Sequence, residues 1–448
     1  MGSNPIPSAT LKASTPLPRG LFFAGGIVRY YIWTAGCQMN KADSQKLAAG
    51  LEHLGLRAVT RPEEADLVVL NTCVVRDHAE ARAISKLGTL KKLRARGHHF
   101  TIAVMGCMVG PRSDELRRRF PYVDVFARPQ EFDPILKAIG LDDVGGEFWP
   151  TTYALPDSPT AYVPVIHGCD KFCTFCIVPY RRGRERSRPI EDVRAEVEHL
   201  ASHGIREVTL LGQTVESYGH DLAGQPDLGD LMRALHDIEG IWRIRFLTSH
   251  PGDMTQRIVD AVAELPKVCN YFNVPVQSGD NTMLERMRRG YTIEEYRDKI
   301  ELIRHRVPDA TITTDVIVGF CGETEKEFRR TYDLLADLRF HKVHVAAYSP
   351  RPGTIAWRRL KDDVPPEVKM ERLHAIEELE AGIAGQINAA LLGARVEVLV
   401  ESRQDERWSG RTSSGKLVHF EGRAAIGEPA AVRIEHTSPW SLRGTAVG

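Results

Sequence analysis

Hydrophobic residues in the first third of the chain form short apolar runs, and longer stretches with apolar positions three or four residues apart separate them. Short apolar runs predict buried strands, and the wider spacing predicts amphipathic helices. Strands that alternate with helices are typical of a parallel, doubly wound α/β sheet. The predicted strands are residues 28–33, 66–71, 100–105 and 123–126, and the clearest helices are residues 44–54 and 78–95.

The same alternation resumes after a polar stretch near residue 150 that contains Pro and Gly and indicates a linker. Six strand–helix units follow. A closed β/α barrel has eight, so the pattern predicts a partial barrel with its chemistry at the C-terminal ends of the strands. The predicted strands are residues 162–167, 207–212, 243–249, 271–276, 311–318 and 342–348.

A long helical pattern over residues 366–392 leads into short alternating runs broken by turn residues. Such runs predict a small β-barrel, a class that often binds RNA. Its predicted strands are residues 395–401, 416–421 and 431–435. The layout therefore comprises a disordered tail (1–26), an N-terminal domain (27–143), a linker (144–160), the partial barrel (161–386) and the small β-barrel (387–448).

Charge and hydropathy narrow the range of partners. The 59 basic residues balance the 59 acidic ones, so a nucleic-acid partner needs a local basic patch. No apolar run approaches the roughly 20 residues that cross a bilayer, so we expect no membrane partner and a cytoplasmic location. Eight cysteines in such a chain favour metal ligation over disulfides.

Three of these cysteines, Cys169, Cys173 and Cys176, stand in one short segment directly after the first predicted barrel strand. Thiolates are the usual ligands of iron–sulfur clusters, and three of them leave one iron of a 4Fe–4S cube open for a small ligand. Zinc is the competing metal, with His167 as the nearest candidate for a fourth ligand. The spacing and the position after the strand favour the cluster.

A second set of three is dispersed over the first domain. Cys37, Cys73 and Cys107 each lie just beyond the end of a predicted strand, and ligands of doubly wound sheets gather at those ends. The topology therefore predicts that three thiols meet at one edge of the sheet and hold a second cluster. Three small cysteines buried in a core are the alternative.

Several segments of the chain resemble the radical S-adenosylmethionine methylthiotransferases of the MiaB type, and the C-terminal tail resembles a TRAM domain. The resemblance covers almost the whole chain after the N-terminal tail. It rests on the segments at residues 36–40, 71–76, 106–107, 168–188, 275–279, 289–292 and 315–320.

The resemblance implies two 4Fe–4S clusters, S-adenosylmethionine and a tRNA substrate. The cluster on the barrel cysteines would cleave the cofactor to a radical, and the N-terminal cluster would carry the sulfur to be transferred. The product would be a methylthio group on carbon 2 of isopentenyl-adenosine beside the anticodon. A reductant such as flavodoxin or ferredoxin and a sulfur donor would also be required.

Further residues are candidates for cofactor and RNA contacts. Phe175 could pack against the adenine, and polar residues at strand ends could touch the cofactor or could instead be satisfied structural groups. Arginines after the cysteine segment could bind tRNA phosphates or form a solvated basic loop. The cofactor candidates are Phe175, Gln213, His250, Gln277 and Asp315, and the RNA candidates are Arg181, Arg182, Arg184, Arg411 and Lys416.

The chain departs from the family pattern at two positions. Thr214 stands where Asn is usual, and Cys321 stands where Pro usually precedes Gly-Glu-Thr. Cys269 and Cys321 have no partner set and are interpreted as structural thiols. Alternative substrates within the family are threonylcarbamoyl-adenosine in tRNA and an aspartate of a ribosomal protein. A non-catalytic iron–sulfur RNA-binding regulator is the alternative from another class.

Overall fold

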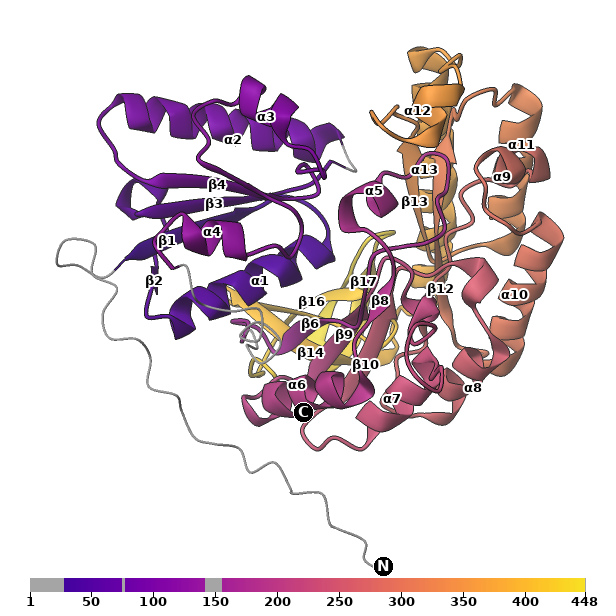
Figure 1. Ribbon diagram of the computed structural model, residues 1–448. Helices are drawn as coiled ribbons and strands as arrows, with labels where there is room; N and C mark the ends of the chain where they lie inside the picture. Colours follow the sequence, from indigo (N-terminus) through magenta and orange to yellow (C-terminus); the bar gives the residue numbers. More distant parts are fainter. Residues whose placement is uncertain (1–27, 75–76, 142–154, 448) are drawn as a thin grey trace, which may run out of the picture.

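The computed structural model describes residues 28–74, 77–141 and 155–447. The expected tail (1–26) and residues 144–154 of the expected linker lie outside these ranges. Along the chain, an N-terminal α/β domain, a partial barrel and a small closed β-barrel follow one another (Figure 1).

The N-terminal domain is a doubly wound sheet, as predicted. Its five parallel strands have the order β2-β1-β3-β4-β5. Alternate side chains of the central strand face opposite sides, so Val69 packs with α1 and α4 while Val68 packs with α2. The elements are β1 (Arg29–Thr34), α1 (Gln38–His53), β2 (Arg57–Ala58), β3 (Leu67–Thr72), α2 (Asp77–Ala95), β4 (Thr101–Gly106), α3 (Asp114–Arg119), β5 (Val125–Ala127) and α4 (Asp133–Lys137).

The central domain is a partial barrel of six parallel strands in two three-stranded sheets, β10-β9-β6 and β11-β12-β13. One bridge, between Ile244 and Val268, connects the two sheets. The strands are β6 (Thr160–Pro164), β9 (Glu207–Leu211), β10 (Arg243–Leu247), β11 (Tyr271–Asn273), β12 (Thr311–Val318) and β13 (Lys342–Ala347).

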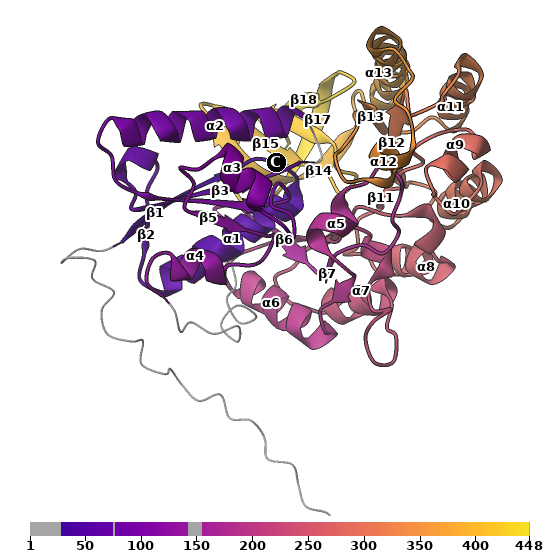
Figure 2. The ribbon, with the colours of Figure 1, turned by 45° about the horizontal axis from the view of Figure 1, so that its top comes forward.

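Helices line the outside of this partial barrel, as Figure 2 shows from a second direction. Shorter elements stand at the C-terminal ends of the strands and build the rim. The outer helices are α6 (Ile190–Ser202), α7 (Leu228–His236), α8 (Gln256–Glu264), α10 (Ile293–Arg306), α11 (Glu325–Leu338) and α13 (Pro366–Ala389). The rim carries β7 (Ile166–His167), α5 (Val178–Arg182), β8 (Arg186–Ser187), α9 (Asn281–Arg286) and α12 (Ile355–Arg359).

The C-terminal domain is a closed barrel with the strand order β14-β15-β16-β18-β17. Alternating side chains such as Val398, Val400 and Val432 fill its interior. The sequence predicted the barrel but located only three of its strands. The five are β14 (Arg395–Gln404), β15 (Arg407–Arg411), β16 (Leu417–Glu421), β17 (Pro429–Thr437) and β18 (Leu442–Ala446).

The tip of the β15–β16 hairpin, residues 412–415, closes the N-terminal end of the partial barrel. Arg245 of β10 donates hydrogen bonds to Glu207 (3.1 Å) and to the carbonyl oxygen of Ser413 (3.1 Å). Arg243 donates to the carbonyl oxygen of Arg411 (2.7 Å). Both arginines are buried and pair with Glu207 of β9, and the hairpin supplies further acceptors for their remaining N–H groups.

None of the helices that the structure describes is long and apolar enough to cross a membrane.

Candidate functional site

The N-terminal cysteines lie together at one edge of their sheet. Cys37, Cys73 and Cys107 follow β1, β3 and β4, which are neighbours in the sheet. Burial raises the pKa of Cys107 to about 11, and the thiols of Cys73 and Cys37 contribute to that rise. The three cysteines therefore lie at one edge of the sheet, and their role as cluster ligands stays a prediction.

Two asparagines fix the strand ends that carry these cysteines. Asn40 donates to the side-chain oxygen of Asn71 (2.9 Å), and Asn71 donates back to the carbonyl oxygen of Asn40 (2.7 Å). The thiol of Cys37 lies 3.4 Å from the side-chain oxygen of Asn40. Gly106, with φ of +95°, fits because a Cβ there would lie 2.4 Å from the Asn71 side chain. These contacts explain the asparagines in the two N-terminal motifs.

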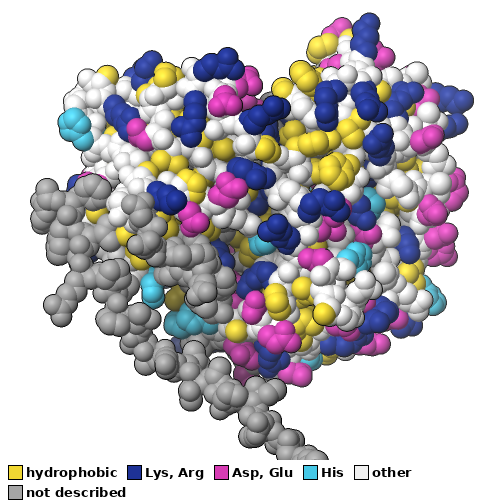
Figure 3. Space-filling model, viewed as in Figure 1, with side chains coloured by type: hydrophobic (Ala, Val, Ile, Leu, Met, Phe, Trp, Pro, Cys, Tyr) yellow, Lys and Arg dark blue, Asp and Glu magenta, His cyan; other side chains and the backbone are white. Residues whose placement is uncertain are grey.

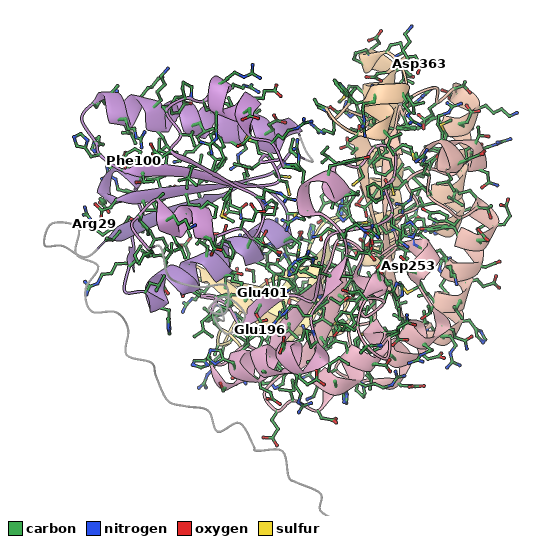
Figure 4. The ribbon with its side chains drawn as sticks, viewed as in Figure 1. Arg29, Phe100, Glu196, Asp253, Asp363 and Glu401 are labelled. Carbon is green, nitrogen blue, oxygen red and sulfur yellow. The ribbon has the colours of Figure 1, made fainter. Side chains whose placement is uncertain are left out.

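The barrel cysteines lie in the rim loop between β7 and α5. The amide of Cys169 donates to Gly183, and the amide of Cys176 donates to Cys173 (3.1 and 3.0 Å). Lys171 in the same loop pairs with Asp253 (2.6 Å), which Figure 4 labels. Burial raises the pKa of Cys176 to about 12, with Cys173 and Cys169 adding to the effect. These thiols also form one interacting group.

Thiolates are the usual ligands of iron–sulfur clusters, so both donor sets fit such a cluster by their chemistry. Within residues 28–74, 77–141 and 155–447, no three His, Cys, Asp or Glu side chains converge on one ion position. A 4Fe–4S cube takes each thiolate at a different corner, so it does not need such convergence. His167, the candidate fourth zinc ligand, lies 2.5 Å from the side-chain nitrogen of Gln130, and burial lowers its pKa to about 3.

A buried arginine accompanies the barrel set. Arg289 lies with a guanidinium nitrogen 3.2 Å from the sulfur of Cys173, and it also donates to the carbonyl oxygen of Pro275 (3.1 Å). The hydroxyl of Thr214 lies 3.4 Å from the sulfur of Cys169. The sequence analysis includes Arg289 and Thr214 in family motifs but does not predict that they contact the cysteines. The first contact crosses 116 residues of chain, so no local pattern reveals it.

A second buried arginine, Arg182, joins the two cysteine regions. It comes from α5 on the barrel rim and pairs with Asp43 of the N-terminal domain at 2.9 Å, with side chains only 4% and 2% exposed. It also donates to Asn40 (3.3 Å). Burial lowers the pKa of Arg182, but Asp43 and the thiols of Cys107 and Cys37 outweigh this effect, so the pKa is raised. The guanidinium therefore stays charged beside the N-terminal thiols.

This position does not support the prediction that Arg182 binds RNA phosphate, because its guanidinium is enclosed between the domains. Arg181 is half-buried with its guanidinium against Gly110, and burial lowers its pKa. Arg184 is 77% exposed and pairs with Asp170 (2.6 Å). Of these three, only Arg184 lies open to solvent.

The two RNA candidates of the small barrel also face other protein groups. Lys416 donates to the side chain of Asn388 in α13 (2.6 Å), and burial lowers its pKa. Arg411 lies 3.8 Å from Glu401 and borders the junction with β10. Lys416 is held against α13, which does not support its assignment to RNA, whereas the Arg411 side chain is 44% exposed and its assignment stays a prediction.

Two cofactor candidates carry unused polar atoms at adjacent strand ends. Gln213 Oε1 and His250 Nε2 are buried, and neither has a hydrogen-bond partner in the part of the chain that the structure describes. Burial, followed by the charge of Arg289, lowers the pKa of His250 to about 3, so its ring is neutral. Such atoms fit a polar ligand that enters the rim.

The other three cofactor candidates have different surroundings. Phe175 packs edge-on against Phe320 with ring centroids 6.4 Å apart. Gln277 lies at the rim with φ of +71° and bridges to Val316. Asp315 was expected at a strand end but lies within β12, where it accepts a hydrogen bond from Asn273 (2.9 Å). β12 spans the predicted residues 311–318, so Asp315 lies three residues before the end of the strand.

The two unpaired cysteines lie apart from both sets. Cys269 is buried near Arg245 at the closed end of the partial barrel. Cys321 is buried in an apolar group with Phe320 and Tyr348.

Comparison with known proteins assigns all three parts of the chain. Residues 29–127 match the uncharacterized protein family UPF0004, residues 163–335 match the Radical SAM superfamily, and residues 389–447 match the TRAM domain. A tRNA-2-methylthio-N(6)-dimethylallyladenosine synthase of Dehalococcoides mccartyi (strain CBDB1) is 47% identical, with 93% of this chain and 98% of that protein covered. The chain belongs to this synthase family.

Other relatives of the chain carry the same name. Synthases of the same name from Roseiflexus sp. (strain RS-1) and Dictyoglomus thermophilum are 47% and 42% identical, covering 93% and 94% of this chain and 89% and 98% of those proteins. The apo form of the cobalamin-dependent S-adenosylmethionine radical enzyme OxsB resembles the fold, with a TM-score of 0.52, 12% identity, and coverage of 79% of this chain and 56% of that one.

Membership makes the chain a radical S-adenosylmethionine methylthiotransferase. An iron–sulfur cluster and S-adenosylmethionine are the cofactors of this class.

Proposed function

We propose that this enzyme transfers a methylthio group to carbon 2 of isopentenyl-adenosine beside the anticodon of tRNA. The names of its relatives supply the substrate class. The observation that carries the proposal is the meeting of two cysteine sets across one domain interface, where Arg182 of the barrel pairs with Asp43 beside the N-terminal set. A transfer reaction needs its two reactive centres to face a common substrate position.

Each cysteine set would hold one 4Fe–4S cluster through three thiolates. The ligands would be Cys37, Cys73 and Cys107 for one cluster and Cys169, Cys173 and Cys176 for the other. When bound, the clusters and S-adenosylmethionine supply radical hydrogen abstraction and the sulfur that is transferred. The buried thiols require nearby positive charge to ionise, and a bound cluster provides it.

The protein's own residues would position and shield these groups. Arg289 and Thr214 donate to the thiolates of Cys173 and Cys169 and so stabilise their charge. Gln213 offers an acceptor and the neutral His250 a ring nitrogen to the cofactor. Phe175 and the apolar group around Phe320 limit the access of water. Gln277, at the rim, stays a candidate for contact with the cofactor.

Mass spectrometry of nucleosides tests the substrate. Anaerobic reaction with isopentenylated tRNA should give the methylthio nucleoside, and the same tRNA without the isopentenyl group should give none. Product from threonylcarbamoyl-tRNA or from a ribosomal protein instead would transfer the assignment to that substrate. Failure to cleave S-adenosylmethionine reductively would favour the non-catalytic regulator. A flavodoxin- or ferredoxin-type reductant and a sulfur donor are proposed as partners, and the same assay can compare them.

A further inference from the structure

Three arginines from two segments line one hollow on the barrel rim. Arg288 follows α9, and Arg358 and Arg359 belong to α12; together with Ile355 they enclose about 380 Å³. All three arginines are exposed. Trp357, on the same short helix, is 52% exposed, although most large aromatic side chains of this protein are buried. We call the space that these three arginines line the arginine hollow, and Trp357 directly precedes Arg358 in the chain.

The arginine hollow borders the cysteine loop. The amide of Thr174, between Cys173 and Cys176, donates to the carbonyl oxygen of Met287 (3.0 Å), and its own carbonyl oxygen accepts from the amide of Ala356 (2.8 Å). Residues adjacent to the hollow therefore hold the loop on both sides. Figure 1 shows α12 at the end of the rim, and Lys and Arg side chains gather over that end of the molecule in Figure 3.

In the part of the chain that the structure describes, no acidic side chain pairs with the arginines of the hollow. Arg288 and Arg359 form no ion pair with any residue in the described ranges. Arg358 lies against neutral groups, the hydroxyl of Tyr180 (3.3 Å) and the carbonyl oxygen of Thr354 (3.2 Å). The acidic residues that follow α12 in the chain have partners elsewhere. Asp362 pairs with Lys369 (2.5 Å) and Asp363, labelled in Figure 4, accepts from the amide of Gly322 (2.6 Å).

Fixed guanidinium groups favour phosphate, and an exposed aromatic ring favours an unpaired base. We propose that the arginine hollow binds the sugar–phosphate backbone of RNA beside the base that is presented to the cysteine loop, with Trp357 as a stacking platform. A single phosphate would not use three arginines and a tryptophan, whereas a strand of successive nucleotides would. The assignment of that RNA to tRNA rests on the proposed function. The inference that the hollow binds phosphates and an unpaired base is independent of the proposed function.

Salt-dependent binding tests the proposal. The variant Arg288→Gln/Arg358→Gln/Arg359→Gln is compared with Arg57→Gln/Lys92→Gln/Arg96→Gln, which removes equal charge from exposed positions outside the rim. The probe is a tRNA anticodon stem–loop, with and without isopentenyl-adenosine. The first variant should bind about tenfold or more weakly at low salt, and its log–log salt slope should fall by about 2. The control variant Arg57→Gln/Lys92→Gln/Arg96→Gln should retain more of the affinity and more of the salt slope than the variant of the arginine hollow.

Two further variants guard against indirect effects. Arg288→Gln/Arg359→Gln leaves the Arg358–Tyr180 contact intact and should still lower the slope by about 1.4. Trp357→Ala should weaken binding about fivefold or more without changing the slope. Iron content and thermal unfolding of each variant verify that it is folded.

The outcomes separate this proposal from the proposed function. If the parent makes the methylthio product but the triple arginine variant binds both stem–loops with the parent's affinity and slope, the arginine hollow is not an RNA site. If the triple arginine variant loses binding to both stem–loops while the parent makes no methylthio product, the arginine hollow is an RNA site and the proposed reaction is refuted.

Discussion

The two cysteine sets both lie at the C-terminal ends of parallel strands, but they are assembled differently. The barrel set comes from one loop, and its neighbouring arginine, Arg289, belongs to the same domain. The N-terminal set comes from three loops, and its neighbouring arginine, Arg182, belongs to the other domain. The barrel set is thus complete within one domain, whereas the charge environment of the N-terminal set requires the domains to dock. Variants in each set can test this difference.

Removing each set has the largest expected effect. Replacing Cys37, Cys73 and Cys107 by Ala should abolish methylthio transfer but retain reductive cleavage of S-adenosylmethionine. Replacing Cys169, Cys173 and Cys176 should abolish both activities. Each triple variant should lose about four of about eight irons, measured by anaerobic iron and sulfide analysis.

Cys269→Ala and Cys321→Ala serve as controls and should retain the full iron content. An unchanged iron count in either triple variant would refute the assignment of that set.

Breaking the interdomain ion pair comes next. Arg182→Met leaves Asp43 buried and unpaired and should cost about 3 to 5 kcal/mol of stability, with selective loss of iron from the N-terminal set. Chemical denaturation and iron analysis measure these effects.

Arg184→Met is the matched control, because its pair with Asp170 is exposed and should contribute at most about 1 kcal/mol. The double variant Arg182→Met/Asp43→Leu should recover part of the loss. Equal losses for Arg182→Met and Arg184→Met would show that docking does not depend on the buried pair.

The barrel cluster should respond to its own arginine. Arg289→Gln removes a positive charge and a hydrogen bond beside Cys173, so the reduced cluster is less stabilised. We expect a reduction potential more negative by about 60 mV, the one-electron equivalent of a tenfold change, in redox titration followed by electron paramagnetic resonance. The N-terminal cluster should keep its potential. A shift of both signals would contradict the self-contained barrel site.

The smallest expected effect concerns Thr214. Thr214→Val removes the hydroxyl near Cys169 and should shift the same potential in the same direction by roughly half as much, because neutral hydrogen bonds are weaker than charged ones. Thr214→Ser keeps the hydroxyl and should show no shift. If Val and Ser behave alike, the hydroxyl does not reach the thiolate.

Much of the fold follows from local periodicity. The apolar runs located the strands that carry Cys37, Cys73 and Cys107, and topology then predicted their common edge. The start of α1 was placed too late, because its first turns are polar yet buried. Asn40 and Asp43 are buried through partners far away in the chain, and no hydrophobic pattern records such pairs. The polar strands β15 and β18 were missed for a similar reason.

The roles of the arginines also depend on partners that are distant in the sequence. The run after the cysteine segment has the composition of a solvated basic loop, but the acidic partner of Arg182 lies 139 residues away. Arg288 and Arg359 are unremarkable in sequence, and only the fold brings them together. Residue type indicated that arginine chemistry was present, whereas burial and partners decided which arginines are open to a ligand.

The β15–β16 hairpin that closes the partial barrel is synthesised long after the strands that it contacts. Arg245 is translated 168 residues before its partner Ser413, which corresponds to roughly 10 to 30 s at ribosomal speed. During that interval both guanidinium groups have Glu207 as a partner but lack the carbonyl oxygens of the hairpin. This end of the barrel is therefore closed only after the hairpin has been translated, and we expect a chain that terminates before β15 to leave the end open to solvent.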